Sequence, residues 1–237
     1  MADLHRLLDL QDRDLSIDQL RHRRDSMPDR GALAVQHATI SRLDGELGAF
    51  EVRLDEQRRA LKRIEDEVAA IETKARSETR KLNSGTITAP REIQALSDEI
   101  DALGRRQRVL EDEELEIMEA VESLTGEIDA LTAQRHEATV EADRLRASIE
   151  EQEESIDTEL AAVTAERAEA LLEIPDDLLA RYERLRSKLD GIAVARLDGD
   201  RCLGCHISLP AMEVDAVRHA PDDAVVTHEE CGRILVR

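Results

Sequence analysis

The sequence predicts a mainly α-helical protein: a long antiparallel coiled-coil hairpin with a small C-terminal module that contains β-strands. Of the 237 residues, 37% are charged and 1% are aromatic, with one Tyr, one Phe and no Trp, so a large aromatic core is excluded. The chain has only 10 Gly and 5 Pro, which is typical of long helices. Two long heptad repeats cover most of the chain, and the pattern changes after Gly191.

The first arm of the hairpin begins with residues 3–26, whose apolar residues have helical spacing. The segment 27–31 contains a proline and a glycine and interrupts this pattern. A heptad repeat then runs over residues 33–82 and forms one apolar stripe, which requires a facing helix. Every a position is apolar: Leu33, Ile40, Leu47, Leu54, Leu61, Val68, Ala75 and Leu82.

The tip of the hairpin is expected at residues 83–90. An Asn-Ser-Gly sequence favours the end of one helix, and Pro90 fits the first turn of the next. A second heptad repeat starts at Ile93 and stays mostly apolar as far as Leu145, after which its d positions become polar. The second arm should therefore pack more loosely, or against other elements, beyond that point.

The simplest arrangement is an antiparallel hairpin over residues 1–173, with a bend near 27–31 and the tip near 83–90. We favour it because each arm then buries the apolar stripe of the other. The alternative folds residues 3–26 back as a third helix of a short bundle. Pairing within one chain satisfies both stripes, so a monomer is favoured, while a dimer stays open.

A short connecting helix is expected over residues 174–190. Pro175 suits its first turn, the acidic residues that follow suit the positive end of the helix dipole, and Gly191 is expected to end it. Residues 192–197 then have the composition of a strand, and an Asp-Gly pair after them favours a hairpin turn.

All three cysteines lie near the C-terminus in two short motifs. Cys202 and Cys205 form one pair, and His228 and Cys231 form a second pair at the same spacing. Each pair forms a tight turn that directs two side chains to one side, and two such turns complete a tetrahedral zinc site. The sequence therefore predicts Zn²⁺ bound by these four residues in a zinc ribbon over residues 191–237. An alternative leaves His228 exposed and outside the ligand set.

Other residues close to these motifs are not expected to bind the metal. His206 directly follows the second cysteine, which makes joint ligation difficult, and His219 lies in the helix expected between the two pairs. Gly204 and Gly232 should relieve backbone crowding in the two turns. The module is small and has no aromatic residue, so it needs a metal to stabilise it.

Negative charge is concentrated in the second arm. The formal net charge is −21, and residues 90–173 hold 25 acidic and 8 basic groups, so the whole chain should not attract phosphate. The segment 74–108 is an exception, with 8 basic and 5 acidic groups. Candidate contacts to a partner or a nucleic acid are Arg80, Lys81, Arg91, Arg105, Arg106 and Arg108 near the tip, and Arg201 and Arg233 in the ribbon.

The sequence does not support an enzyme. A metal site with four protein ligands leaves no position for substrate, and the chain lacks a phosphate-binding loop, a dinucleotide fingerprint and a nucleophile triad. It also lacks an apolar run of membrane-spanning length and a secretion signal, and its few cysteines favour a reducing compartment, which predicts a cytoplasmic protein. We expect a regulatory scaffold or adaptor that binds protein partners. The alternative is RNA or DNA binding through the ribbon or the basic tip.

Several short motifs follow one another in a characteristic order. They are Asn83-Ser84-Gly85 and Pro90-Arg91-Glu92-Ile93 at the tip, Ile174-Pro175-Asp176-Asp177 before the connecting helix, and the two ligand pairs. This order resembles a bacterial family of helical-hairpin proteins with a C-terminal C4-type zinc ribbon, long classed as a domain of unknown function.

The Arg, Ala and Asp content resembles an actinobacterial member of that family. The resemblance implies a cytoplasmic coiled-coil protein with a ribbon beside the base of its hairpin. In that family a histidine often follows the second cysteine without being a ligand, which agrees with the exclusion of His206. The sequence departs from the four-cysteine pattern at His228.

Overall fold

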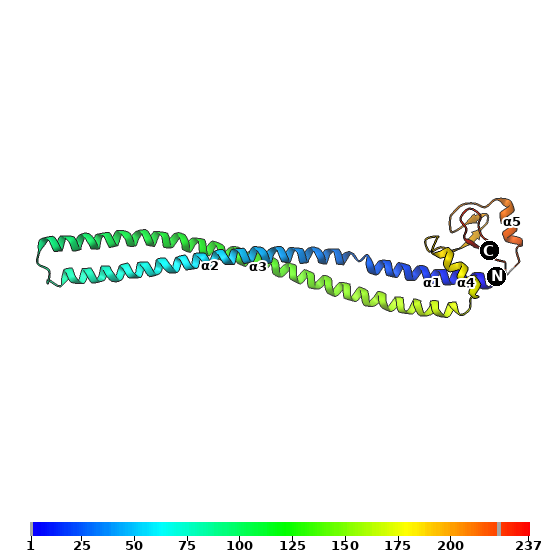
Figure 1. Cartoon of the computed structure of the whole chain (residues 1–237), viewed down its shortest axis with the longest axis horizontal. Helices are drawn as coiled ribbons and strands as arrows, with labels where there is room; N and C mark the ends of the chain where they lie inside the picture. Colours follow the sequence, from blue (N-terminus) through cyan, green and yellow to red (C-terminus); the bar gives the residue numbers. More distant parts are fainter. Residues whose placement is uncertain (1, 222–223) are drawn as a thin grey trace. The chain divides into compact units, whose positions relative to one another are not determined.

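The computed structural model describes residues 2–221 and 224–237. It forms two compact units, which we call the ribbon unit (Met1–Arg30 and Arg146–Arg237) and the hairpin unit (Gly31–Leu145). The structure confirms the predicted fold class, since long helices form a hairpin and a small sheet lies near the C-terminus (Figure 1). Its elements are α1 (Ala2–Asp25), α2 (Pro28–Asn83), α3 (Pro90–Leu171), α4 (Asp176–Arg186), β1 (Val194–Asp198), β2 (Arg201–Cys202), α5 (Ala211–His219) and β3 (Ile234–Val236).

In the hairpin unit, α2 and α3 run antiparallel. Two ion pairs between the helices show the direction: Lys74 Nζ lies 2.6 Å from Glu99 Oε1, and Arg135 Nε lies 2.5 Å from Asp44 Oδ1. The residue further along α2 thus pairs with the residue that comes earlier in α3. This is the pairing that the two heptad repeats predict.

The predicted apolar stripes form the interface of this hairpin. Leu43 and Leu54 of α2, and Leu110 and Leu124 of α3, are between 1% and 7% exposed. Most of the other a and d side chains in this unit are half-buried. This partial burial is expected, because a single partner helix covers only one side of each stripe.

A short loop joins the two helices at the tip. The hydroxyl of Ser84 donates a hydrogen bond to the carbonyl of Lys81 at 2.7 Å, and Gly85 has a φ of +71°, where glycine is favoured. The amide of Ile93 then donates to the carbonyl of Ala89 at 3.1 Å and closes the first turn of α3.

In the ribbon unit, α1 runs antiparallel to the last part of α3. Arg24 Nε lies 2.9 Å from Asp157 Oδ1, and Arg6 Nε lies 3.1 Å from Glu173 Oε2. The third-helix arrangement of residues 3–26 is therefore not observed. The polar d positions at this end of α3 also contact the first arm, since Glu166 lies 3.5 Å from an arginine of α1.

Two boundaries in this unit differ from the sequence prediction. The break between α1 and α2 involves only Ser26 and Met27, because Pro28 is well suited to the first position of α2. The connecting helix α4 ends at Arg186, before Gly191. Hydrogen-bonded turns continue from there, since the amide of Leu189 donates to the carbonyl of Leu185 at 3.0 Å. Gly191, with a φ of +87°, closes these turns, and its amide donates to the carbonyl of Arg186 at 3.1 Å.

The C-terminal sheet has the strand order β2-β1-β3, with β1 antiparallel to β2 and parallel to β3. Alternate side chains point to its two faces. Val194 and Ile234 pack with the leucines of α1 and with Tyr182 of α4. Ala195 and Leu235 pack on the opposite face with residues of α5. Each face thus depends on a helix that covers it.

Two buried polar residues of α1 fix these contacts. Gln11 accepts hydrogen bonds from the amides of Ala193 and Val194 at 2.7 and 2.8 Å, and donates one to the Val194 carbonyl at 2.9 Å. Asp14 accepts bonds from the Tyr182 hydroxyl at 2.7 Å and from Arg167 Nε at 2.6 Å. The first helix is therefore bonded to β1, to α4 and to the end of α3.

We predict that Leu54→Asp will destabilise the hairpin unit by about 3 kcal/mol, because a charge would replace a buried side chain in the interface of α2 and α3. Thermal unfolding followed by circular dichroism at 222 nm measures this change. The matched control is Val52→Asp two residues away, at a side chain that is 60% exposed, where the expected loss is below about 0.5 kcal/mol. Equal melting curves for the two variants would contradict the assigned interface.

We predict that Tyr182, the one tyrosine of the chain, resists ionisation in the folded protein. Burial, followed by the hydrogen bond to the Asp14 carboxylate, raises the pKa of Tyr182 well above its ordinary value of 10.0. Phenolate absorbance at 295 nm should therefore titrate near pH ~10 only in denaturant. Because the folded pKa is the higher one, the stability from this group is present below about pH 10 and is lost as the pH rises through the folded pKa.

The control for this titration is Asp14→Asn, which keeps a hydrogen-bond acceptor but removes the charge. The pKa of Tyr182 should fall in this variant, because its carboxylate partner is gone. An identical titration of the variant and the unaltered chain would show that the carboxylate does not contribute.

Candidate metal centre

The first ligand pair lies in a tight turn at the end of β2. The carbonyl of Cys202 accepts a hydrogen bond from the amide of His206 at 2.8 Å. His206 has a φ of +64°, in the left-handed region that closes such a turn. The turn places Cys205 between these two residues, on the same side as Cys202.

The second ligand pair lies in a turn with the same hydrogen bond. The carbonyl of His228 accepts a bond from the amide of Gly232 at 2.7 Å, and Gly232 has a φ of +72°. Gly232 thus has the position that His206 has in the first turn, and glycine adopts this φ without strain. The amide of His228 donates to the carbonyl of Arg233 at 2.9 Å, which joins the turn to the start of β3.

Gly204 is needed for close packing and has no positive φ. A Cβ at this position would lie 2.6 Å from Arg233 Cδ and 2.9 Å from Ala195 Cβ. Arg233 extends over the first turn, and its Nε donates to the carbonyl of Ile192 at 3.0 Å. Arg233, predicted as a partner contact, therefore packs against the first turn and bonds to the segment just before β1.

The two turns bring four candidate ligands together: Cys202, Cys205, His228 and Cys231, whose ligand atoms lie within 4.8 Å of one another. His228 Nδ1 is 3.1 Å from Cys231 Sγ and 3.4 Å from Cys205 Sγ. Tetrahedral zinc with these ligands has donor atoms about 3.5 Å apart, so the set fits one ion. The His228 side chain is 0% exposed, so an exposed His228 is not observed. His206 is exposed and lies outside this set.

The surroundings affect the thiols differently. Burial raises the pKa of the Cys202 thiol. Burial also acts against ionisation of Cys205, but hydrogen bonds from the backbone of Ile207 and from the neighbouring cysteines outweigh it and lower the pKa of the Cys205 thiol. A metal must bind thiolates, and a bound metal itself favours their deprotonation.

Within the described residues, the second ring nitrogen of His228 lacks the hydrogen-bond partner that metal-binding histidines usually have. Nε2 is buried and has no hydrogen-bond partner in the described part of the chain. Metal binding through Nδ1 requires the proton on Nε2, which leaves one buried donor unpaired at a cost of about 1–3 kcal/mol. Histidine is therefore a less favourable ligand here than in sites where its other nitrogen has a partner.

The basic residues selected from the sequence fall into both units. In the hairpin unit, Lys81 lies 2.8 Å from Glu78, and Arg106 lies 3.5 Å from Glu67. Within the described residues, those that are exposed and have no ion pair are Arg80, Arg91, Arg105 and Arg108. In the ribbon unit, the Arg201 side chain donates to the His206 carbonyl at 3.0 Å.

The sequence reasoning assigned no role to two residues that support the ribbon. Gln11 and Asp14 hold β1 and α4, on the face of the sheet opposite the metal ligands. Only one feature of the sequence points to them: both are polar residues that lie close to the apolar face of the helix predicted over residues 3–26.

A coiled-coil hairpin that carries a ribbon with two x2-spaced ligand pairs defines the class of this protein. Residues 10–190 match the model of the CT398-like coiled coil hairpin domain, and residues 201–235 match that of the C4-type zinc ribbon domain. The chain belongs to the CT398-like coiled-coil hairpin family. The predicted resemblance is thereby confirmed.

Curated relatives place the chain among actinobacterial proteins. An uncharacterized protein of Mycobacterium tuberculosis is 28% identical over 241 residues, which cover 100% of this chain and 96% of the relative. An uncharacterized protein of Mycobacterium leprae is 26% identical over 225 residues, with 93% and 94% of the two chains covered.

Solved structures share the fold. A protein from Mycobacterium smegmatis has a TM-score of 0.82 at 23% identity, with 100% of this chain and 97% of that chain covered. CT398 from Chlamydia trachomatis has a TM-score of 0.66 at 20% identity, with 99% and 97% covered. Among the described residues of the present chain, no helix is both long enough and apolar enough to cross a bilayer.

We predict that Cys205→Ser will abolish stoichiometric zinc binding and unfold the ribbon, while most of the helix content remains, because the hairpin unit does not include the ligands. Zinc analysis, limited proteolysis and circular dichroism measure these effects. The matched control is the adjacent His206→Asn, since Asn tolerates a positive φ and His206 lies outside the ligand set. A protease-resistant ribbon in the serine variant would contradict the prediction.

Proposed function

We propose that this protein is a non-enzymatic scaffold or adaptor with a regulatory role, which binds protein partners and is stabilised by zinc. The observation that carries the proposal is the closed ligand set of three sulfurs and one fully buried imidazole. Catalytic zinc sites keep a position for water or substrate, whereas a site with four protein ligands is structural. Within the described residues, no second cluster of this kind is found.

The zinc ion would be held by Cys202, Cys205, His228 and Cys231. It would join the turn at the end of β2 to the turn before β3 and so stabilise the sheet. Thiolate ligands require a reducing environment, which agrees with a cytoplasmic protein. The ribbon then serves as a rigid end module beside helices whose exposed faces are charged.

Partner binding is supported by the exposed charge of the hairpin unit. Residues 31–83 hold 10 basic and 10 acidic groups, whereas residues 109–134 hold 9 acidic and no basic groups. Charge of one sign on an exposed face steers a complementary partner and excludes others. Such a surface fits a protein that acts through association.

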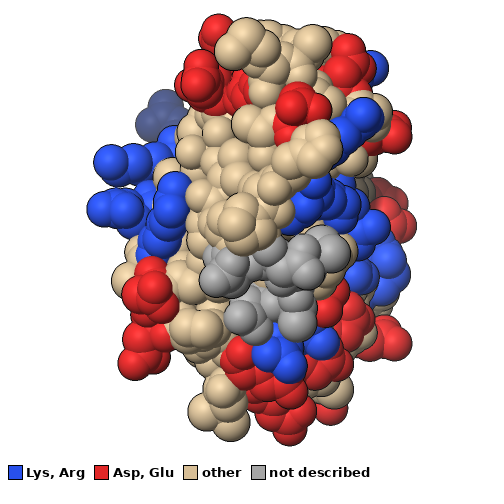
Figure 2. Space-filling view, turned by 90° about the vertical axis from the view of Figure 1, so that its right-hand side faces the viewer, with Lys and Arg blue, Asp and Glu red and all other residues tan. Residues whose placement is uncertain are grey.

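A second candidate function is nucleic-acid binding through the tip or the ribbon. Arg80, Arg91, Arg105 and Arg108 favour it, because they are exposed and have no ion pair within the described residues. For the ribbon, Figure 2 argues against a continuous basic track on the surface that it shows, which is the right-hand side of Figure 1, where the ribbon lies. Among the residues drawn in colour there, Lys and Arg form separate groups with uncharged surface between them.

A salt titration separates these two functions. We expect no binding of single-stranded RNA or double-stranded DNA to the full chain at about 50 mM salt, measured by fluorescence anisotropy. Binding at that salt concentration, weakened by Arg105→Ala with Arg108→Ala but not by Arg42→Ala, would support the nucleic-acid alternative. Arg42 is the matched control because it is exposed on the same unit and belongs to an intrahelical ion pair.

The nature of the metal site is tested separately. We expect one zinc ion per chain with three sulfur ligands and one nitrogen ligand, measured by X-ray absorption spectroscopy. A coordinated water in place of His228 would mean an open site and would contradict the non-enzymatic assignment.

A further inference from the structure

One exposed face of α3 in the hairpin unit combines apolar and acidic side chains. Leu115 is 59% exposed and Met118 is 48% exposed, and their spacing of three residues places them side by side on the helix. Glu111 and Glu122 extend the same stripe by four residues at each end and are also exposed. We call these four residues the acidic-apolar face.

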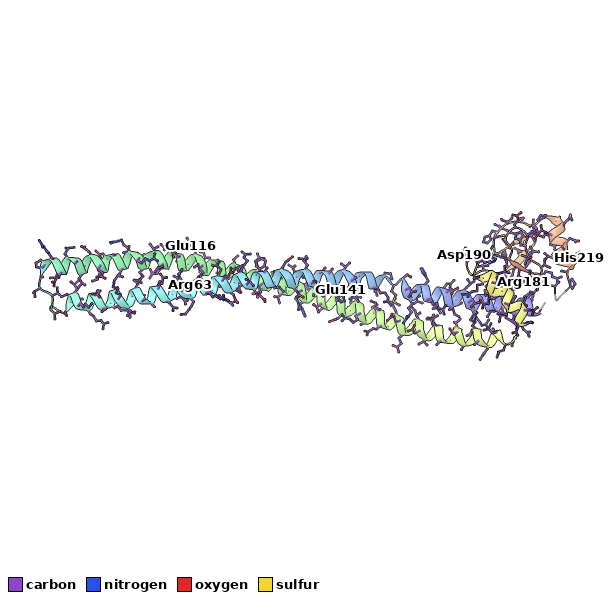
Figure 3. All side chains as sticks on the ribbon, in the orientation of Figure 1. Arg63, Glu116, Glu141, Arg181, Asp190 and His219 are labelled. Atoms are coloured by element: carbon purple, nitrogen blue, oxygen red, sulfur yellow. The ribbon has the colours of Figure 1, made fainter. Side chains whose placement is uncertain are left out.

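The carboxylates around this face have few partners within the protein. None of the six from Asp112 to Glu122 forms an ion pair within the described part of the chain. Glu111 accepts a hydrogen bond from Gln107 at 2.7 Å, which leaves its charge uncompensated. Figure 3 shows Glu116 at this level of α3, with Arg63 of α2 at the same level of the hairpin.

A second acidic run on the same helix shows that charge alone does not define this face. Residues 150–154 contain four glutamates, and the apolar residues on either side of the run, Ile149 and Ile156, are buried. One of these glutamates, Glu153, pairs with Arg30. The 111–122 segment differs from this second run, because its large apolar side chains Leu115 and Met118 are exposed among carboxylates without an ion pair to any residue that the structure describes.

We propose that the acidic-apolar face binds a basic amphipathic helix of a partner protein. Leu115 and Met118 would contact two apolar side chains of that helix at helical spacing, and Lys or Arg beside them would pair with the surrounding carboxylates. Methionine adapts to differently shaped apolar partners, which suits a docking surface. This inference rests on the proposed protein-binding function and names the surface and the chemistry of the partner.

Charge excludes two other occupants of this face. A nucleic acid would bring phosphates to a segment of 26 residues, 109–134, that has no basic group. A second copy of the chain would place an identical acidic face against this one, and it carries a net charge of −21, so the two copies would repel each other. A basic helix satisfies both the carboxylates and the exposed apolar pair.

The experiment uses the full zinc-bound chain and a short synthetic helical peptide, with Leu on one face and Lys beside it, in isothermal titration calorimetry. A peptide of the same composition in scrambled order is the peptide control. We expect Leu115→Ser with Met118→Ser to weaken binding by about tenfold or more, and Glu119→Gln with Glu122→Gln to weaken it and reduce its salt dependence. Val140→Ser, at another exposed apolar residue of α3, should change affinity by less than about twofold.

Three results of the peptide titrations would overturn the assigned face. They are equal binding of the ordered and scrambled peptides, binding unaffected by the Leu115 and Met118 variant, and an equal loss with Glu150→Gln and Glu151→Gln. Concentration-dependent dimerisation lost in the same double variant would also overturn it, in favour of a second copy. None of these results bears on the ligand set of the zinc site or on the proposed non-enzymatic role, so failure of this inference is distinct from failure of the proposed function.

Discussion

The small C-terminal sheet cannot be stable by itself, and the arrangement of the ribbon unit follows from this constraint. Its strands have five, two and three residues, too few to bury a core without cover on both faces. Helices α1 and α4 cover one face, and α5 with the cysteine and histidine cluster covers the other. The first and last segments of the chain therefore have to meet. Gln11 completes that contact by bonding to the backbone of β1 as a neighbouring strand would.

The features that were predictable from the sequence depend on spacing within short windows. The heptad repeat requires only that apolar residues recur at fixed intervals, and Leu54 and Leu110 are buried where the repeat places them. The ligand pairs are likewise local, because each is one tight turn closed by a hydrogen bond between residues four apart. The contact between the two turns was also predictable from the sequence, because all cysteines of the chain lie in these two segments.

The features that were missed depend on contacts between distant segments. Gln11 is 183 residues from Val194 in the sequence, and Asp14 is 168 residues from Tyr182. No local pattern indicates that a glutamine and an aspartate on α1 will be buried against β1 and α4. The end of α4 differs from the prediction for a more local reason. Residues 187–190 form hydrogen-bonded turns instead of regular α-helix, and Gly191, with a φ of +87°, closes them.

The excess of acid in α3 is not explained by the stability of the hairpin. Interhelical ion pairs such as Lys74 with Glu99 need only scattered charges, and α2 supplies equal numbers of both signs over residues 31–83. Like charges three or four residues apart on one helix destabilise it by about 0.2–0.5 kcal/mol per pair, and residues 109–134 contain several such pairs without a basic residue. The buried interface tolerates this cost, because the apolar stripes and not the outer charges hold the helices together. Folding does not require this costly arrangement, and the proposed binding of a basic helix would account for it, because the exposed Leu115 and Met118 lie among these carboxylates.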